Sequence, residues 1–111
     1  MDRTLWYLVA GTRGGENRGR ILWKLVDNPM NTNQLAEELD LNYRTVSHHL
    51  EVLEDNSLIE KHGEGYGCLY FLTENMESNV DELEKILMKS EYDFFETSET
   101  EAGSEATTTS T

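Results

Sequence analysis

Cysteine, histidine and long apolar runs are scarce in this chain of 111 residues. A single cysteine, Cys68, excludes an internal disulfide, and one thiol with three histidines gives too few ligands for a cysteine-rich zinc site. The N-terminal apolar run covers only residues 5–10, so it predicts neither a signal peptide nor a membrane span. We therefore expect a cytoplasmic protein that uses no metal and no other cofactor.

Basic residues are also few. The chain has 22 acidic and 9 basic residues and a net charge of −13, which opposes contact with phosphate groups. The excess is concentrated at one end, because residues 1–73 carry a net charge of −4 and residues 74–111 carry −9. Such a composition indicates a halophilic cytoplasm, where salt screens charge repulsion beyond about 3 Å at 1 M. An acidic interaction tail would explain part of the same excess.

Catalytic signatures are absent as well. A Gly-rich stretch at residues 11–17 has no strand before it and no Lys-Ser/Thr pair after it, so we interpret it as a turn between helices and not as a phosphate loop. There is no Ser-His-Asp signature, and abundant acidic side chains on a charged surface are usually only solvated. The sequence therefore predicts a protein that is not an enzyme.

Two closely spaced helix starts dominate what is present. Asn31 and Asn42 are both suitable N-cap residues, the first with Gln34 three positions later as the partner of a capping box. Apolar residues recur at helical spacing after each cap, and only residues 40–42 are left for the turn. Two short amphipathic helices joined this tightly are typical of a helix-turn-helix, with residues 42–54 as the second helix.

A hairpin follows the helix pair. Residues 59–72 contain two strand-forming apolar runs on either side of a turn with three glycines. Because such a hairpin is marginal alone, we expect Ile59, Leu69 and Phe71 to pack against the helices. The expected fold is therefore mainly α-helical with a small β-hairpin, a winged helix-turn-helix.

The run TNQLAEELDLNYRTVSHHLEVLEDNSLIEKHGEGYGCLYFLT resembles ArsR-type winged helix-turn-helix transcriptional regulators, especially acidic archaeal members whose opening is similar to LWYLVAGTRGG. Its most specific part is V-S-x-H-L-x-x-L, from Val46 to Leu53, followed by N-S-L-I and the hairpin. The resemblance covers residues 5–73 and implies a sequence-specific regulator that binds double-stranded DNA as a homodimer. Metal-binding members carry a C-x-C pair where this chain has NQLAEELDL, or use C-terminal histidines that residues 74–111 lack, so we expect no metal.

The start of a recognition helix enters the major groove, so its outward polar side chains are the candidates for DNA contact. They can bind base edges or phosphate groups, and the wing adds a small basic and aromatic group suited to backbone or minor-groove contact. His49 flanks the buried face, which favours a structural histidine over a phosphate contact. The predicted DNA contacts are Tyr43, Arg44, Thr45, Ser47, His48, Lys61, His62 and Tyr66, with weaker phosphate contacts from Arg18 and Arg20.

Amphipathic segments flank this unit at both ends. Residues 4–10 suit a short helix, and Asn79 is a suitable cap for a longer one over residues 80–95. We expect these helices to form the seam of a homodimer, with packing inside one chain as the alternative. Residues 1–95 are thus one predicted domain, and residues 96–111 a disordered acidic and Thr-rich tail. The predicted interface residues are Leu5, Trp6, Val9, Val80, Leu83 and Leu87.

A second class of function also suits the sequence. The net charge and the modest basic patch are compatible with a winged helix that binds other proteins, in a transcription or toxin-antitoxin assembly. The two hypotheses differ in the role of Arg44 and His48, which matter for DNA affinity only in the regulator.

Overall fold

The structure, a computed structural model, describes residues 2–89, apart from the side chains of Asp2 and Tyr66. The last part of the predicted C-terminal helix and the predicted tail, residues 90–111, lie outside the described residues. Helices and one antiparallel hairpin make up the described chain, which confirms the predicted fold class. The elements are α1 (Asp2–Ala10), α2 (Gly15–Asp27), α3 (Thr32–Leu39), α4 (Tyr43–Asp55), β1 (Ile59–His62), the 3-10 turn η1 (Gly65–Gly67), β2 (Leu69–Leu72), α5 (Glu74–Glu77) and α6 (Val80–Lys89).

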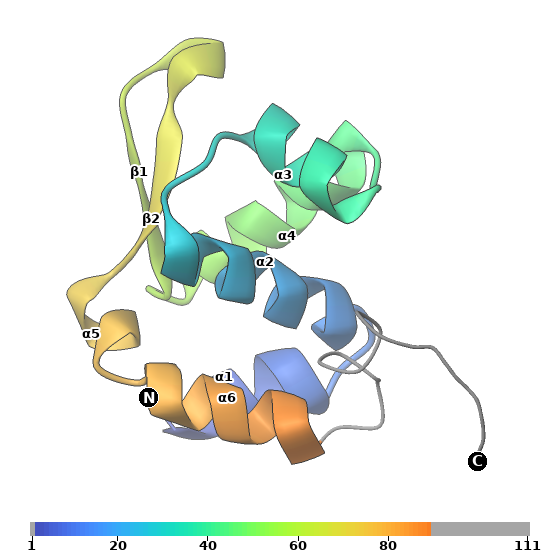
Figure 1. Ribbon diagram of the computed structural model, residues 1–111, viewed down its shortest axis with the longest axis vertical. Coiled ribbons are helices and arrows are strands. Elements are labelled where there is room, and N and C mark those ends of the chain that lie inside the picture. Colours follow the sequence, from blue (N-terminus) through green and yellow to red (C-terminus); the bar gives the residue numbers. More distant parts are fainter. Residues whose placement is uncertain (1, 90–111) are drawn as a thin grey trace.

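Helix α2 is the centre of the arrangement. It contacts α1 and α6 on one side and α3, α4 and β2 on the other (Figure 1). Its apolar stripe of Ile21, Leu22 and Leu25 is buried, as its helical spacing requires. As a result the paired terminal helices α1 and α6 lie at one end of the molecule, and the tip of the β1–β2 hairpin at the other (Figure 1).

The predicted caps fix the helix pair α3–α4. The Asn31 side chain accepts a hydrogen bond from the Gln34 amide at 2.8 Å, and the Gln34 side chain accepts from the Asn31 amide at 2.8 Å, which is a complete capping box. Asn42 caps α4 by accepting from the Thr45 amide at 2.8 Å. Asp40 adopts left-handed backbone angles with φ 57°, so the chain reverses within the three residues predicted for the turn.

The hairpin packs on the helices with a face that the sequence analysis assigned wrongly. Antiparallel partners share a face, and the register pairs Ile59 with Leu72 and Lys61 with Tyr70. Ile59 and Leu72 are buried, so the inward residues of β2 are Tyr70 and Leu72 and not the predicted Leu69 and Phe71. The Tyr70 amide also donates to the Met30 carbonyl at 2.8 Å, which ties the wing to the α2–α3 connection.

The terminal helices pack against each other within one chain. Leu5, Val9, Leu83 and Leu87 are each at most 1% exposed, because α1 and α6 bury them against one another and against α2. This corrects the expectation that these four side chains form the seam between two chains, and follows the alternative of packing inside one chain. Trp6 and Val80, the other two predicted interface residues, are half-buried.

A short helix, α5, had not been predicted because four residues are too few to show a period. Thr73 caps it by accepting from the Met76 amide at 3.1 Å, and Met76 is fully buried. Within residues 2–89, no helix has the length and apolar character needed to cross a bilayer.

Candidate nucleic-acid interface

Helix α4 separates its buried and exposed residues sharply. Val46, Leu50 and Leu53 are at most 1% exposed, which fixes the rotation of the helix on its core. The opposite face carries a shallow hollow of about 430 Å³, lined by Tyr43, Arg44, Ser47, His48 and Glu51. Four of these five were predicted as DNA contacts. Glu51, one turn further on, adds an acidic group that the sequence analysis did not include.

Thr45 plays a different part from its neighbours. It is half-buried, and its amide donates to the Asn42 side chain in the N-cap of α4. Its side chain does not line the hollow on α4.

Arg18 is a structural residue, which corrects the prediction of a phosphate contact. Its side chain is only 5% exposed, and its Nε donates to the Leu8 carbonyl at 2.8 Å. One terminal nitrogen donates to the Arg13 carbonyl at 3.2 Å and to the Thr12 hydroxyl. The guanidinium therefore holds the end of α1 and the following loop against α2. The Arg20 side chain is half-buried and forms no hydrogen bond or ion pair within residues 2–89.

His49 completes this buried group and agrees with the prediction of a structural histidine. It is 7% exposed, and its Nδ1 lies 3.4 Å from the Arg18 Nη1. Because arginine can only donate, Nδ1 must accept and the proton of the neutral ring must lie on Nε2. Burial lowers the pKa of His49, and the charges of Arg18 and His48 lower it further. Helix α4 is thus joined to Arg18 of α2 through a neutral imidazole.

The wing does not gather its predicted contacts at one place. His62 lies on the face opposite Lys61, where its Nε2 is 3.5 Å from a Glu60 carboxylate oxygen and its ring packs edge-on against Phe71. The side chain of Tyr66 lies outside the described part of the chain. Of the predicted wing contacts whose side chains the structure describes, Lys61 alone lies beside α4.

A polar cavity, here called the wing pocket, lies where the start of α3, the exposed face of α4 and the wing meet. Its volume is about 200 Å³, and its polar lining includes Thr32, Asn33, Tyr43, Ser47, Lys61 and Tyr70. Three of these residues, Thr32, Asn33 and Tyr70, were not among the predicted contacts. They belong to α3 and β2, whereas the predicted contacts that line the pocket lie on α4 and β1, so no local sequence pattern connects the two sets.

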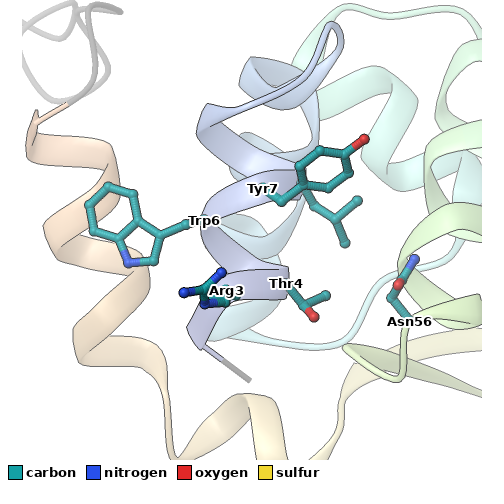
Figure 2. A pocket seen from close by; sticks show the side chains of 6 residues that line it. Arg3, Thr4, Trp6, Tyr7 and Asn56 are labelled. Atoms are coloured by element: carbon teal, nitrogen blue, oxygen red, sulfur yellow. The ribbon is translucent and has the colours of Figure 1, made fainter.

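A larger cleft lies on α1, away from the wing. Its volume is about 630 Å³, and its lining comes from α1 and from the end of α4 (Figure 2). Figure 2 shows Trp6 directed toward α6 and Asn56 across the cleft from α1, and the Trp6 indole donates to a Glu82 carboxylate oxygen at 2.6 Å. Tyr7 and Met88 are 63% and 68% exposed, so each of the two terminal helices carries one exposed large apolar side chain.

Potential metal ligands are dispersed over the described chain. No group of three or more His, Cys, Asp or Glu side chains within residues 2–89 is arranged to hold an ion. Cys68 is a buried free thiol at the wing pocket.

Comparison with known proteins bears on the helix-turn-helix and on the fold. A family model described as a helix-turn-helix domain matches residues 16–62. No match was found among curated protein sequences. Several solved structures are similar. A MarR transcriptional regulator from Methanosarcina mazei Go1 has a TM-score of 0.61 at 19% identity, with 68% of this chain and 57% of that chain covered.

Two further structures are covered more completely. HlyU from Vibrio cholerae N16961 has a TM-score of 0.62 at 21% identity, with 79% of this chain and 94% of that chain covered. The transcriptional regulator YodB from B. subtilis, in its reduced form, has a TM-score of 0.63 at 20% identity, with 78% of this chain and 84% of that chain covered. This chain spans little more than half of the MarR regulator and nearly all of HlyU. Residues 16–62 are therefore similar to a helix-turn-helix domain, and the chain has a winged helix-turn-helix fold like that of these regulators.

Proposed function

We propose that this protein regulates transcription by binding double-stranded DNA, with α4 as the recognition helix. The observation that carries this proposal is the exposed face of α4, where Tyr43, Arg44, Ser47 and His48 surround one hollow. Hydroxyl, guanidinium and imidazole groups of this kind bind base edges and phosphate groups in a major groove. The buried face of the same helix keeps these groups in a fixed orientation.

Charge contributes little to this binding. Arg44 is the one fixed positive charge on the exposed face of α4, and Glu51 opposes it at the same hollow. If each chain of a dimer engages phosphate groups with Arg44 and Lys61, four contacts predict a slope of log K against log salt of about −3.6. Affinity should therefore depend on hydrogen bonds and shape, and persist to higher salt than for a basic regulator.

The DNA-binding experiment compares the natural chain with Arg44→Ala and His48→Ala on duplexes selected from a random library. Each change should weaken specific binding by about 1–3 kcal/mol and leave the fold intact, since both side chains are exposed. Lys85→Ala is the matched control, because Lys85 is an exposed cation on α6. Absence of specific and non-specific duplex binding at every salt concentration up to molar would refute the proposal.

A homodimer is part of the proposal, with its contact at exposed apolar side chains of the terminal helices α1 and α6. Tyr7 on α1 and Met88 on α6 are the exposed large apolar residues at this end of the described chain. A symmetric contact through these helices would leave both copies of α4 free to enter grooves about 34 Å apart.

The dimer is tested on exposed residues. Tyr7→Asp with Met88→Asp should give folded monomers in light scattering at unchanged circular dichroism. Leu83→Asp and Leu87→Asp are unsuitable, because both residues lie in the chain's own core and their replacement would unfold the monomer. A dimer that survives the Tyr7 and Met88 changes would place the interface elsewhere.

A protein-binding role is the second candidate, and Glu51 is the observation that favours it, since an acidic group on the recognition face repels phosphate. Unchanged DNA binding by Arg44→Ala and His48→Ala, or no DNA binding at all, would support this role. The ArsR type, the archaeal and halophilic origin and the cytoplasmic setting are likewise proposals, supported by sequence resemblance and composition.

A further inference from the structure

The wing pocket combines one cation with a set of hydroxyl groups. Lys61 is paired with Tyr70 in the hairpin register, so both side chains leave the sheet on the face that meets the helices. Glu60 and His62 leave it on the other face, where they lie 3.5 Å from each other. Lys61 forms no ion pair within residues 2–89, so its charge at the pocket is not neutralised by a neighbour.

Hydrogen-bond donors surround this charge. Burial raises the pKa of Tyr70, Cys68 and Glu54 raise it further, and a hydrogen bond with Thr32 lowers it by a smaller amount. The phenol therefore stays protonated at neutral pH, in hydrogen-bonding contact with Thr32 and Cys68 at the pocket. Ser47 and Tyr43 bring two further hydroxyl groups from α4. Asn33 is exposed at the start of α3, where the first amides of a helix have no acceptor within it.

The size of the pocket limits what it can hold. Its volume of about 200 Å³ is below the range of roughly 300–1,000 Å³ that drug-sized ligands occupy. It corresponds to about six or seven water molecules at roughly 30 Å³ each. A small, strongly accepting anion fits this space and this donor set.

We propose that the wing pocket holds a single phosphate group, with Lys61 supplying the charge and Tyr43, Ser47 and Tyr70 supplying hydrogen bonds. This inference rests on the proposed function, because the phosphate group is then one of the DNA backbone, gripped between the recognition helix and the wing. The wing thus contributes through its inward face, and the His62 side takes no part.

The first test uses inorganic phosphate alone. Sodium phosphate replaces sodium chloride at constant ionic strength in the full chain, and amide shifts are followed by NMR. Shifts centred on residues 32–33, 61 and 70 are expected, and they should be lost in Lys61→Gln but kept in Lys85→Gln, the exposed-cation control. Absence of phosphate-dependent shifts at the pocket would overturn the proposal.

The second test uses DNA. Lys61→Gln should make the slope of log K against log salt shallower by about 0.9 per chain, because one phosphate contact is lost. Tyr70→Phe should weaken binding several-fold and leave the slope unchanged, because it removes a donor and no charge. Lys85→Gln should change neither quantity.

The outcomes separate the two sources of phosphate and the two proposals. If phosphate binds at the pocket and Lys61→Gln lowers the slope, the backbone assignment stands. If phosphate binds there but Lys61→Gln has the same salt slope and the same DNA affinity as the natural chain, the occupant is free phosphate and the backbone assignment fails. If phosphate binds there and no duplex binds at all, the proposed function fails while the phosphate site stands.

Discussion

Replacing Arg18 with Gln tests whether this arginine supports the fold or contacts DNA. The change removes a buried guanidinium that donates to the Leu8 carbonyl at 2.8 Å and to the Arg13 carbonyl at 3.2 Å. Hydrogen bonds from a charged group contribute roughly 1.5–3 kcal/mol each, and relief of the buried charge offsets part of this loss. We expect the free energy of unfolding to fall by about 3 kcal/mol, and the Tm to fall by at least about 12 °C.

Urea denaturation followed by circular dichroism measures this loss, and Arg20→Gln is the matched control on the same helix. The Arg20 side chain is half-buried and forms no hydrogen bond or ion pair within the described chain, so its replacement should change stability by less than about 0.5 kcal/mol. NMR titration gives a second reading, because Arg18→Gln removes one of the charges that lower the pKa of His49, and that pKa should rise. Unchanged stability together with a shallower salt dependence of DNA binding would refute the structural role.

Three further predictions concern the same core. His49 has a pKa below its ordinary value of 6.5, so on acidification the unfolded chain takes up the proton first. The stability contributed by neutral His49 is therefore full above pH 6.5 and is lost as the pH falls from there toward the folded pKa. Denaturation at several pH values should show this loss, and His49→Gln should remove it. Leu50→Ala should cost about 2–5 kcal/mol in urea denaturation, because Leu50 is 1% exposed beneath the recognition face, and a cost under about 1 kcal/mol would contradict its packing. Gly15→Ala should be destabilised by at least about 2 kcal/mol in thermal melts, because its Cβ would lie 2.1 Å from the Val9 carbonyl oxygen. The control Gly67→Ala has open space at its Cβ and should melt at nearly the same temperature as the natural chain.

Local chemistry made the helix-turn-helix predictable. Asn31 and Asn42 have side chains that satisfy amides two or three residues ahead, and those bonds form as expected. The apolar spacing that followed each cap also predicted which face of α4 is buried, from Val46 to Leu53. Since each of these relations joins residues only three or four positions apart, they depend little on the rest of the fold.

Contacts between distant segments were not predictable in this way. Arg18 was expected at phosphate groups because its position in the first turn of a helix is unfavourable for a cation. Its acceptors belong to residues 8, 12 and 13, in the preceding helix and loop, and its other neighbour, His49, lies 31 positions away. A pattern within one helix shows neither the hydrogen bonds of Arg18 to the preceding helix and loop nor its contact with His49.

The sequence by itself determined the helix pair α3–α4, the caps of these two helices and the outward face of α4, because hydrogen bonds and apolar periods within a helix are local. Only the tertiary structure decided which side of the wing faces inward, since a shift of one residue exchanges the two faces and a short apolar strand does not specify the choice. It also decided that Leu83 and Leu87 are buried in their own chain, and that Lys61 and Tyr70 meet α4 at one pocket. The burial of these residues depends on which surfaces α2 and the hairpin cover, and that is fixed only when the whole chain folds.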